Sequence, residues 1–511
     1  MQLGLRSLLT SSRGRLSRAL LLAPVVSLLA LGVSSGIAAA DEKSPAPKAA
    51  SPATSPKLEP TKTTLPNGLE VILDEDHRTP IVTVNIWYHV GSKDEADRRN
   101  GFAHLFEHVM FQGSKHVAED TYFRHLEKSG ATSINGTTNT DRTNYFETVP
   151  SNQLELALWL ESDRMGFLLD HADEKTFQSQ RDVVKNERRQ NYENAAYGLV
   201  GQYIREELFP KEHPYHRLTI GTPADLDAAT IEDVRAFFRK YYVPNNATLV
   251  LSGDFDPKKA LALVEKYFGP IPRGPVVTRP YPNPSPRAAG AATLPAPRAA
   301  GATTVVSHPG EARIEVEAGV ELPRVYVSWP TPPIFTQADG ELDLVSHVLS
   351  GGKTSRLYKR LVYDLQIAQS VSASQASMEL ASVFEIVATA KPGHTAEELL
   401  KVIDEELGKL RSGGVTDGEL GRARTSILAD SVFEIERSSA RANRINSYNH
   451  YVGDPSWLQK DMARTTSATT ESVASTARTW LKEKDRVVTL VTPKKDAPMA
   501  GKVVNVERGG Q

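Results

Sequence analysis

The chain has 511 residues, no cysteine, and 60 basic against 62 acidic side chains, which gives a formal net charge of −2. With 40% hydrophobic and 24% charged residues it falls in the ordinary globular range, so neither wholesale disorder nor a polytopic membrane protein is expected. The near-neutral charge also argues against a nucleic-acid partner, which would normally require a basic excess. Without cysteine, disulfides and thiol nucleophiles are excluded, and any metal must be bound by His, Asp and Glu side chains.

Residues 1–40 have the pattern of a secretory signal peptide. Residues 1–18 contain four arginines and no acidic residue, an apolar run follows over residues 19–32, and the small residues Ala38, Ala39 and Ala40 come next. We predict cleavage after Ala40 and a periplasmic or secreted protein; an uncleaved N-terminal anchor is the alternative. No later stretch is long enough to cross a membrane. Cleavage would leave 56 basic residues (60 − 4) against 62 acidic ones, a net charge of −6.

Changes in composition along the rest of the chain indicate where its domains and linkers lie. A stretch rich in Pro, Ala, Ser and Lys follows the signal and predicts a flexible tether. Nine prolines fall within residues 270–298, where the hexamer Pro-Arg-Ala-Ala-Gly-Ala begins twice, and this predicts an extended linker. We therefore expect a tether (41–60), an N-terminal domain (61–270), a Pro/Ala-rich linker (271–312), a C-terminal domain (313–495) and a tail (496–511).

The two predicted domains resemble each other. Strands are expected at Glu70–Leu73 and Ile81–Tyr88, and Arg324–Trp329 resembles the second of these. Each half also ends in a helix, a turn and a strand, over residues 234–251 and 473–490. Two repeats in the same order predict duplicated domains that face each other. The fold class is α/β (α+β), with two homologous domains that each contain a mainly antiparallel sheet flanked by helices and that close like a clam shell.

One short helix carries the predicted chemistry. The segment Gly101–Phe111 contains His104, Glu107 and His108, which lie on one helical face at this spacing. Two neutral imidazoles one turn apart can bind a divalent metal, and a carboxylate beside them can deprotonate a bound water. The alternative is a buried amphipathic helix whose histidines only form hydrogen bonds, but it poorly explains two histidines and a glutamate in an oily helix. The pattern is the inverted zincin motif, which needs a third ligand.

The mature chain resembles the pitrilysin-like zinc metallopeptidases, which include the mitochondrial processing peptidase, over essentially its whole length. In that family a glutamate about eighty residues after the histidine motif is the third zinc ligand, on a helix similar to Arg181–Glu187 here. Glu187 stands 79 positions after His108 (187 − 108), so the resemblance implies one Zn²⁺ per chain bound by His104, His108 and Glu187, with Glu107 as the general base. From the residues alone, Glu187 would be assigned to a solvated surface.

A second segment implies the mode of substrate binding. Residues 130–145 resemble the family strand whose exposed edge pairs with an extended peptide, which makes Asn135 and Gly136 candidate substrate contacts. A Thr/Asn-rich hairpin explains the composition equally well. The histidines of the loop His213–His216, which also matches the family, are interpreted as structural.

Three positions depart from the family pattern and bear on whether the chain needs a partner subunit. Many members carry an acid at the position of Gln180, seven residues before the ligand glutamate. Self-sufficient members also carry an Arg and a Tyr that hold the scissile peptide, at positions occupied here by Val362 and Gln369. We therefore predict the catalytic subunit of a heterodimer whose related partner supplies the Arg/Tyr pair. A phosphate-loop look-alike at Leu349–Ser355 lacks the required first glycine and is rejected.

The sequence thus predicts an exported zinc metalloendopeptidase of the bacterial catalytic-subunit type that cleaves unfolded peptides or small proteins, with no other cofactor. Two alternatives remain. The chain is a non-catalytic structural or assembly subunit of the same family, or it is a periplasmic peptide-binding protein with little turnover. A zinc assay and a cleavage assay separate the three hypotheses.

Overall fold

The computed structural model describes residues 57–279 and 310–509. The predicted signal peptide, most of the predicted tether and the central part of the predicted linker lie outside these residues. No helix in the described part of the chain is long and apolar enough to cross a membrane.

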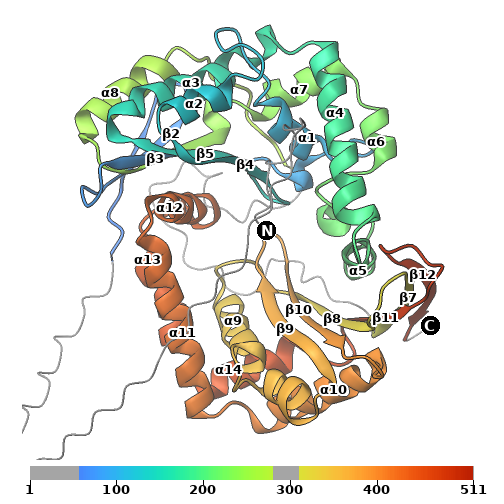
Figure 1. Cartoon of the computed structure of the whole chain (residues 1–511). Helices are drawn as coiled ribbons and strands as arrows, with labels where there is room; N and C mark the ends of the chain where they lie inside the picture. Colours follow the sequence, from blue (N-terminus) through green and yellow to red (C-terminus); the bar gives the residue numbers. More distant parts are fainter. Residues whose placement is uncertain (1–56, 280–309, 510–511) are drawn as a thin grey trace, which may run out of the picture. The chain divides into compact units, whose positions relative to one another are not determined.

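The described residues contain two sheets of six strands each (Figure 1). The first sheet has the order β1-β2-β6-β3-β5-β4 and the second β12-β7-β11-β8-β10-β9. The strands of the first are β1 (Thr61–Thr64), β2 (Glu70–Glu75), β3 (Ile81–Tyr88), β4 (Thr132–Thr138), β5 (Thr143–Pro150) and β6 (Ala247–Gly253). Those of the second are β7 (Ala312–Ala318), β8 (Arg324–Thr331), β9 (Ala368–Ala376), β10 (Ser382–Ala390), β11 (Val487–Pro493) and β12 (Lys502–Arg508).

The two sheets share one topology. β2 pairs with β6 in parallel, as β7 pairs with β11, and the other pairings in both sheets are antiparallel. The repeated helix-turn-strand segments of the sequence are α7 (Ile231–Tyr241) with β6 and α14 (Thr470–Trp480) with β11. The two sheets differ only in the strand at one edge. In the first sheet this strand, β1, is the first strand along the chain, and in the second sheet the equivalent strand, β12, is the last. The predicted α/β fold with two related, mainly antiparallel sheets is confirmed.

Helices pack on one face of each sheet to form the two main hydrophobic cores. In Figure 1, α2, α3 and α8 cover the first sheet in this way. The remaining helices before residue 280 are α1 (Phe102–Val109), α2 (Tyr122–Lys128), α3 (Leu154–Phe167), α4 (Glu174–Arg188), α5 (Val200–Leu208), α6 (Pro223–Asp227) and α8 (Pro257–Phe268). The others after residue 310 are α9 (Gln337–Ser350), α10 (Ala396–Gly413), α11 (Asp417–Ile435), α12 (Ser438–Val452) and α13 (Leu458–Thr466).

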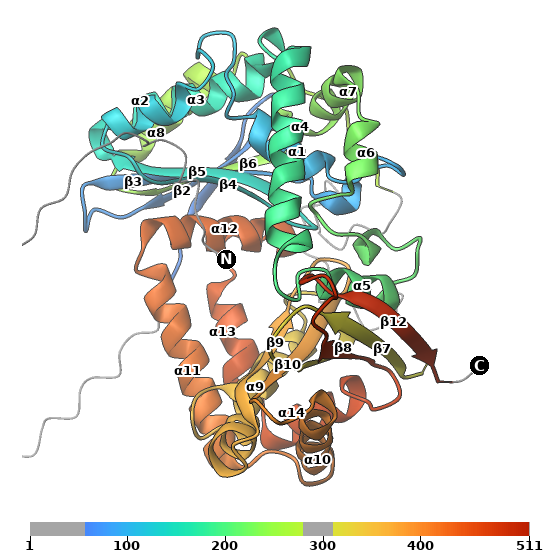
Figure 2. The same ribbon diagram turned by 45° about the vertical axis from the view of Figure 1, so that its right-hand side comes forward.

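Each sheet is covered on its second face by a helix from the other half of the chain (Figures 1 and 2). Helix α12 packs on β3 and β6, where Ile445 joins a cluster with Ile72 and Val250. Helix α5 packs on β7, β8 and β11, where Ile204 joins a cluster with Ile314. Because both faces of each sheet are covered at its centre, central strands such as β3 contain no exposed residue. The two halves therefore depend on each other to bury their apolar surfaces.

Two predicted boundaries are wrong in part. The predicted tail 496–511 contains β12, which pairs with β7 and forms the edge of the second sheet. Val503 packs against the cluster beneath α5, whereas Val504 and Val506 are exposed, so this short segment is stabilised mainly by pairing with β7. The start of the predicted linker also packs on the first domain, because Ile271 is buried in its core.

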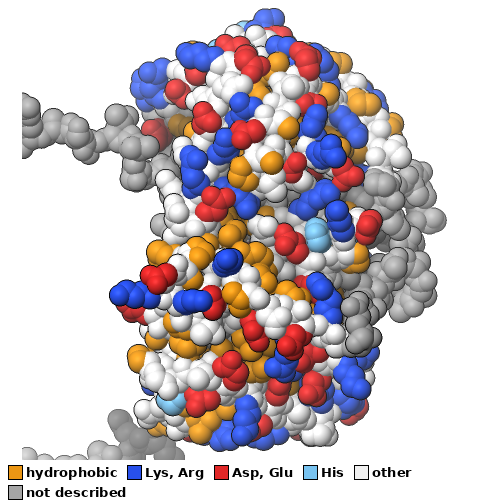
Figure 3. All heavy atoms as spheres, turned by 90° about the vertical axis from the view of Figure 1, so that its right-hand side faces the viewer, with side chains coloured by type: hydrophobic (Ala, Val, Ile, Leu, Met, Phe, Trp, Pro, Cys, Tyr) orange, Lys and Arg blue, Asp and Glu red, His pale blue; other side chains and the backbone are white. Residues whose placement is uncertain are grey.

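Charge is distributed evenly over the surface that Figure 3 draws. Basic and acidic side chains lie interspersed there and do not gather by sign. This distribution agrees with the near-neutral composition and offers no basic surface of the kind that binds nucleic acid on that face.

Candidate metal centre

The motif helix α1 is held in place by its buried apolar face and by a cap at its N-terminus. Phe102, Leu105, Phe106 and Val109 are buried in the first core, so the opposite face of the helix carries the polar residues. Gly101 precedes the helix with φ of 96° and provides no side-chain cap. The carboxylate of Glu95 replaces that cap, since it accepts hydrogen bonds of 2.9 Å from the backbone N–H groups of Gly101 and Ala103.

The structure brings the three predicted ligands together. Helix α4, which begins after the capping residue Asp173, packs against α1 and carries Glu187 near its C-terminal end. Oε2 of Glu187 lies 3.6 Å from Nε2 of His104 and 3.3 Å from Nε2 of His108. Candidate ligand atoms of all three residues lie within 4.8 Å of one another, and no other group of three or more His, Asp or Glu within residues 57–279 and 310–509 meets this condition.

This donor set fits a zinc ion. Two imidazole nitrogens and one carboxylate oxygen are ligands of catalytic zinc sites, which keep a fourth position for water or substrate. Ligands at tetrahedral angles and bond lengths of about 2.0–2.2 Å lie roughly 3.3–3.6 Å apart. The two distances from Glu187 to the histidines agree with that spacing. All three side chains also remain partly accessible, with exposed fractions of 12%, 15% and 35% for His104, His108 and Glu187.

The electrostatics of the ligands favour metal binding. Burial and the neighbouring His108 lower the pKa of His104 to about 4, so the imidazole is neutral at pH 7 and can donate a lone pair. Burial would raise the pKa of Glu187, but the hydrogen bond with His108 and the electrostatic interactions with both imidazoles outweigh it and lower this pKa. The carboxylate is therefore ionised, as a ligand must be.

Glu107 lies between the metal ligands and the outer strand of the first sheet. Burial raises the pKa of its carboxyl above the ordinary value, while His108 and a hydrogen bond with Thr138 oppose this rise. A Cβ atom added to Gly136 on β4 would come within 3.1 Å of Cγ of Glu107. Glycine at this position therefore lets the strand approach the carboxylate closely. A buried carboxyl whose pKa is raised above the ordinary value is suited to general acid and base chemistry.

The predicted substrate segment forms a hairpin whose first strand is an outer one. β4 pairs with β5, and no other strand of the described residues pairs with β4. The segment is therefore a Thr/Asn-rich hairpin whose first strand has an unpaired edge among the described residues, and pairing of that edge with a peptide stays a prediction. Asn135 is exposed, and its side-chain oxygen accepts a hydrogen bond from the backbone N–H of Gly136. Whether these two residues contact substrate stays a prediction.

The positions that depart from the family pattern lie on α4, on the short helix Tyr358–Asp364 and on β9. Gln180 is buried on α4, and Val362 is partly buried against the second core. Gln369 is exposed on β9, which is the outer strand of the second sheet. None of the three supplies a cation or a phenol to the metal centre.

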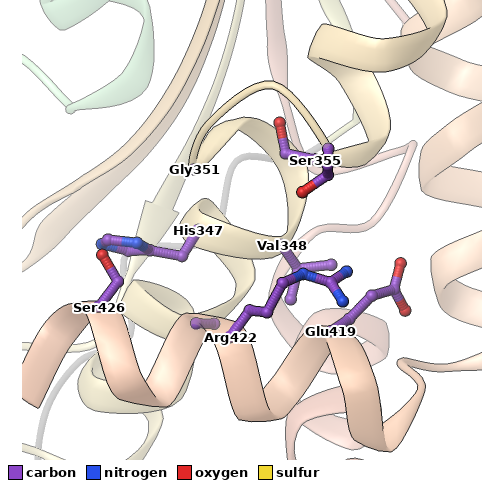
Figure 4. Close-up of a pocket in the computed structure, with 9 residues that line it drawn as sticks. His347, Val348, Gly351, Ser355, Glu419, Arg422 and Ser426 are labelled. Carbon is purple, nitrogen blue, oxygen red and sulfur yellow. The ribbon is translucent and has the colours of Figure 1, made fainter. Parts of the chain in front are cut away.

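The rejected phosphate-loop segment lines a small pocket between α9 and α11 (Figure 4). In the close-up His347 lies next to Ser426, and Arg422 and Glu419 of α11 lie on the opposite side of the pocket from Ser355. The pocket offers about 30 Å³, which is room for a water molecule and not for a phosphate ester. The structure therefore gives this segment no nucleotide site.

Three residues near the centre were not predicted. Glu95 caps the motif helix, Thr138 hydrogen-bonds Glu107, and Arg142 on the β4–β5 turn lies close enough to lower the pKa of Glu107. Glu95 precedes α1 by several residues of irregular chain, so no capping pattern marks it. Arg142 was within the segment compared with the family strand, but at a position that the pattern leaves open.

Comparisons with known proteins agree with this geometry. A family model described as "Insulinase (Peptidase family M16)" matches residues 70–217, and another, "Peptidase M16 inactive domain", matches residues 228–427. Zinc protease PqqE of Helicobacter pylori is 30% identical over 75% of this chain and 82% of its own length. The probable mitochondrial-processing peptidase subunit beta of Arabidopsis thaliana is 24% identical over 85% of this chain and 79% of its own.

A solved structure supports the same assignment. The crystal structure of a protease from Helicobacter pylori matches with a TM-score of 0.76 and 26% identity, over 86% of this chain and 100% of that one. The relatives that are named zinc proteases also agree with the donor set of the three ligands. The chain therefore belongs to the insulinase family of peptidases, family M16.

Proposed function

We propose that this chain is a zinc-dependent endopeptidase that cleaves unfolded peptides or small proteins. The observation that carries the proposal is the convergence of His104, His108 and Glu187 beside Glu107, next to the unpaired edge of β4. Two imidazoles, a carboxylate ligand and a separate carboxyl base form the set that hydrolysis of a peptide bond requires.

His104, His108 and Glu187 would hold one zinc ion per chain. When bound, the ion supplies Lewis acidity, which acidifies a water molecule and polarises a peptide carbonyl. The three side chains come from two helices that pack on each other, so the positions of the ligands depend on the packing of α1 against α4. Glu95 contributes indirectly, because it holds the N-terminus of α1.

Glu107 would move the protons of the reaction. Its carboxylate accepts a proton from the attacking water and then donates it to the amine of the leaving peptide, which must be protonated to depart. Burial raises its pKa, so the carboxyl holds the transferred proton more readily than an exposed glutamate would. The hydrogen bond with Thr138 favours the ionised form and orients the side chain.

An extended substrate would add to the edge of β4. Residues 136 and 138 lie on the side of this strand that faces α1, as the contacts of Gly136 and Thr138 with that helix indicate. A peptide paired with β4 would run past Glu107 and expose one of its bonds to the metal centre. This mode selects unfolded chains, because a folded protein cannot offer a free extended segment.

The proposal includes a partner and export. Val362 and Gln369 supply neither the cation nor the phenol that hold the scissile peptide in self-sufficient members, so a related chain would provide them in a heterodimer. The basic, apolar and small-residue segments within residues 1–40 support removal of a signal peptide and a periplasmic or secreted location.

The test is replacement of Glu107 with glutamine. Zinc content of the purified protein, measured by mass spectrometry of the metal, should stay at the wild-type value, and peptide cleavage should fall by about 10²–10⁴-fold because the base is lost. Glu127→Gln is the matched control, since it makes the same change on an exposed position of α2. Retained cleavage in Glu107→Gln would refute the assigned role of this residue.

A second candidate function is peptide binding without turnover, in a non-catalytic subunit. The identities of Val362, Gln369 and Gln180 favour it, because each removes a polar or charged group found in active members. Zinc binding and peptide binding without cleavage, even after the related partner is added, would support this candidate.

A further inference from the structure

Arg142 lies beside the outer strand β4 without an acidic partner. Its Nη1 donates to the backbone oxygen and to Oγ1 of Thr137, at 2.9 and 2.6 Å. Its Cζ lies 5.1 Å from the centre of the Trp87 ring, which restricts the guanidinium on one side. Nε is buried without a hydrogen-bond partner, and no carboxylate of the described residues lies within ion-pair distance. Buried cations in proteins are ordinarily paired.

The nearest acids cannot serve as that partner. Asp141 accepts from the backbone N–H of Glu379 at 3.0 Å, forms a hydrogen bond with Tyr215, and lies 4.0 Å from Nζ of Lys93. Its carboxylate is therefore already satisfied. Glu107 faces Gly136, and side chains alternate along a strand, so Glu107 and the side chain of Thr137 lie on opposite sides of β4.

The guanidinium nevertheless lies next to the edge that a substrate would occupy. Thr137 belongs to β4, the outermost strand, and Arg142 reaches it from the start of β5. A peptide strand added to β4 would lie about 4.8 Å away, and its side chains opposite Thr137 would point to the side of Arg142. An aspartate or glutamate there could approach the unpaired N–H groups of the guanidinium.

We propose that Arg142 forms a subsite for an acidic side chain of the peptide substrate. This inference rests on the proposed function and adds a preference to it. Gly136 lies beside Glu107 and is the neighbour of Thr137 in β4, so the acidic residue of the substrate would stand within about two positions of the cleaved bond. The substrates would be acidic or locally acidic unfolded peptides.

The test uses pairs of unfolded peptides that differ only in Asp against Asn, or Glu against Gln, at each position around the cleaved bond. The full-length mature chain, with its related partner if cleavage requires one, is compared with Arg142→Gln and Arg142→Glu. Arg422→Gln is the control, because Arg422 is an exposed arginine of α11 in the second domain that forms no ion pair within the described residues (Figure 4). Zinc content and circular dichroism verify that each variant is folded.

At one position the wild type and Arg422→Gln should prefer the acid over the amide by about tenfold in kcat/KM, which corresponds to about 1.4 kcal/mol. This ratio should fall to about one in Arg142→Gln, and Arg142→Glu should prefer lysine at the same position. An equal acid-to-amide ratio in the wild type and Arg142→Gln, or no preference at any position in the wild type, would overturn the proposal.

A binding measurement separates this proposal from the proposed catalytic function. In the Glu107→Gln background, fluorescence anisotropy gives the Kd of the same labelled peptides without cleavage. A tenfold lower Kd for the acidic peptide that Arg142→Gln abolishes would support the subsite even if no variant cleaves peptides. Equal Kd values for both members of every pair, or no binding of any peptide, would overturn it.

Discussion

Replacing Glu95 with alanine removes both hydrogen-bond acceptors from the N-terminus of α1. The carboxylate binds the N–H groups of Gly101 and Ala103, each at 2.9 Å, and Gly101 has no side chain that could cap the helix instead. Loss of a helix cap costs about 0.5–2 kcal/mol, and this cap makes two hydrogen bonds through one half-buried carboxyl group, whose pKa burial raises to about 8. We expect the variant to be about 2 kcal/mol less stable than the wild type.

The same change should weaken zinc binding. His104 and His108 are carried by the helix that Glu95 holds, so a frayed first turn would displace His104 from Glu187. Residues that orient metal ligands typically contribute 10–100-fold to metal affinity, and we expect a loss of about tenfold here. The assays are urea unfolding of the metal-free protein and competition for zinc with a chromogenic chelator.

The matched control is Asp97→Ala. Asp97 is an exposed acid two residues away that forms an ion pair with Arg217, and exposed pairs contribute at most about 1 kcal/mol. If Glu95→Ala matched Asp97→Ala in both stability and zinc affinity, the cap would not position the metal ligands and the reasoning would be refuted.

Three further predictions concern other parts of the fold. Burial and the neighbouring His450 hold the pKa of His89 well below its ordinary value, so near pH 6 only the unfolded chain binds this proton. The free energy of unfolding should therefore fall by about 1.4 kcal/mol as the pH is lowered from about 6 to 5. In urea titrations His89→Gln should lose this pH dependence. Ile445→Ala should destabilise the protein by about 2–5 kcal/mol and increase hydrogen exchange in β2 and β6 of the other domain. Faster exchange confined to the C-terminal half would contradict the packing of α12 on the first sheet. The double variant Val362→Arg, Gln369→Tyr should raise cleavage by the isolated chain at least tenfold, and an unchanged rate would show that these positions do not limit activity.

The motif helix could be predicted from the sequence because its information is local. His104, Glu107 and His108 occur within one turn, and helical geometry alone puts them on one face. Glu187 is different, because its approach depends on the packing of α4 against α1. No local pattern distinguishes this residue from other exposed acids, so only the family resemblance identified it.

The packing of α5 and α12, each on the sheet of the other half of the chain, could not be predicted for a related reason. The face that α12 buries mixes Ala442 and Ile445 with polar residues such as Arg441, so no apolar stripe marks this helix as the cover of a sheet. Helix α5 does bury the apolar stripe Val200, Ile204 and Leu208, but the stripe does not show which sheet it covers. β12 was missed because its strand is short and its burial comes mainly from pairing with β7. Glu95 and Arg142 act through a few side-chain hydrogen bonds to the backbone or to a neighbouring side chain, and such bonds leave no periodic pattern in the sequence.

The central claim, that the three ligands hold one catalytic zinc ion, is tested most directly by a zinc titration of the metal-stripped protein. Cleavage of an unfolded peptide, with the related partner present, should return in proportion to bound zinc and stop increasing at one ion per chain. His108→Ala should bind no zinc in this range and recover no cleavage. Full cleavage by the stripped protein, or restoration that is equal in His108→Ala and the wild type, would contradict the account.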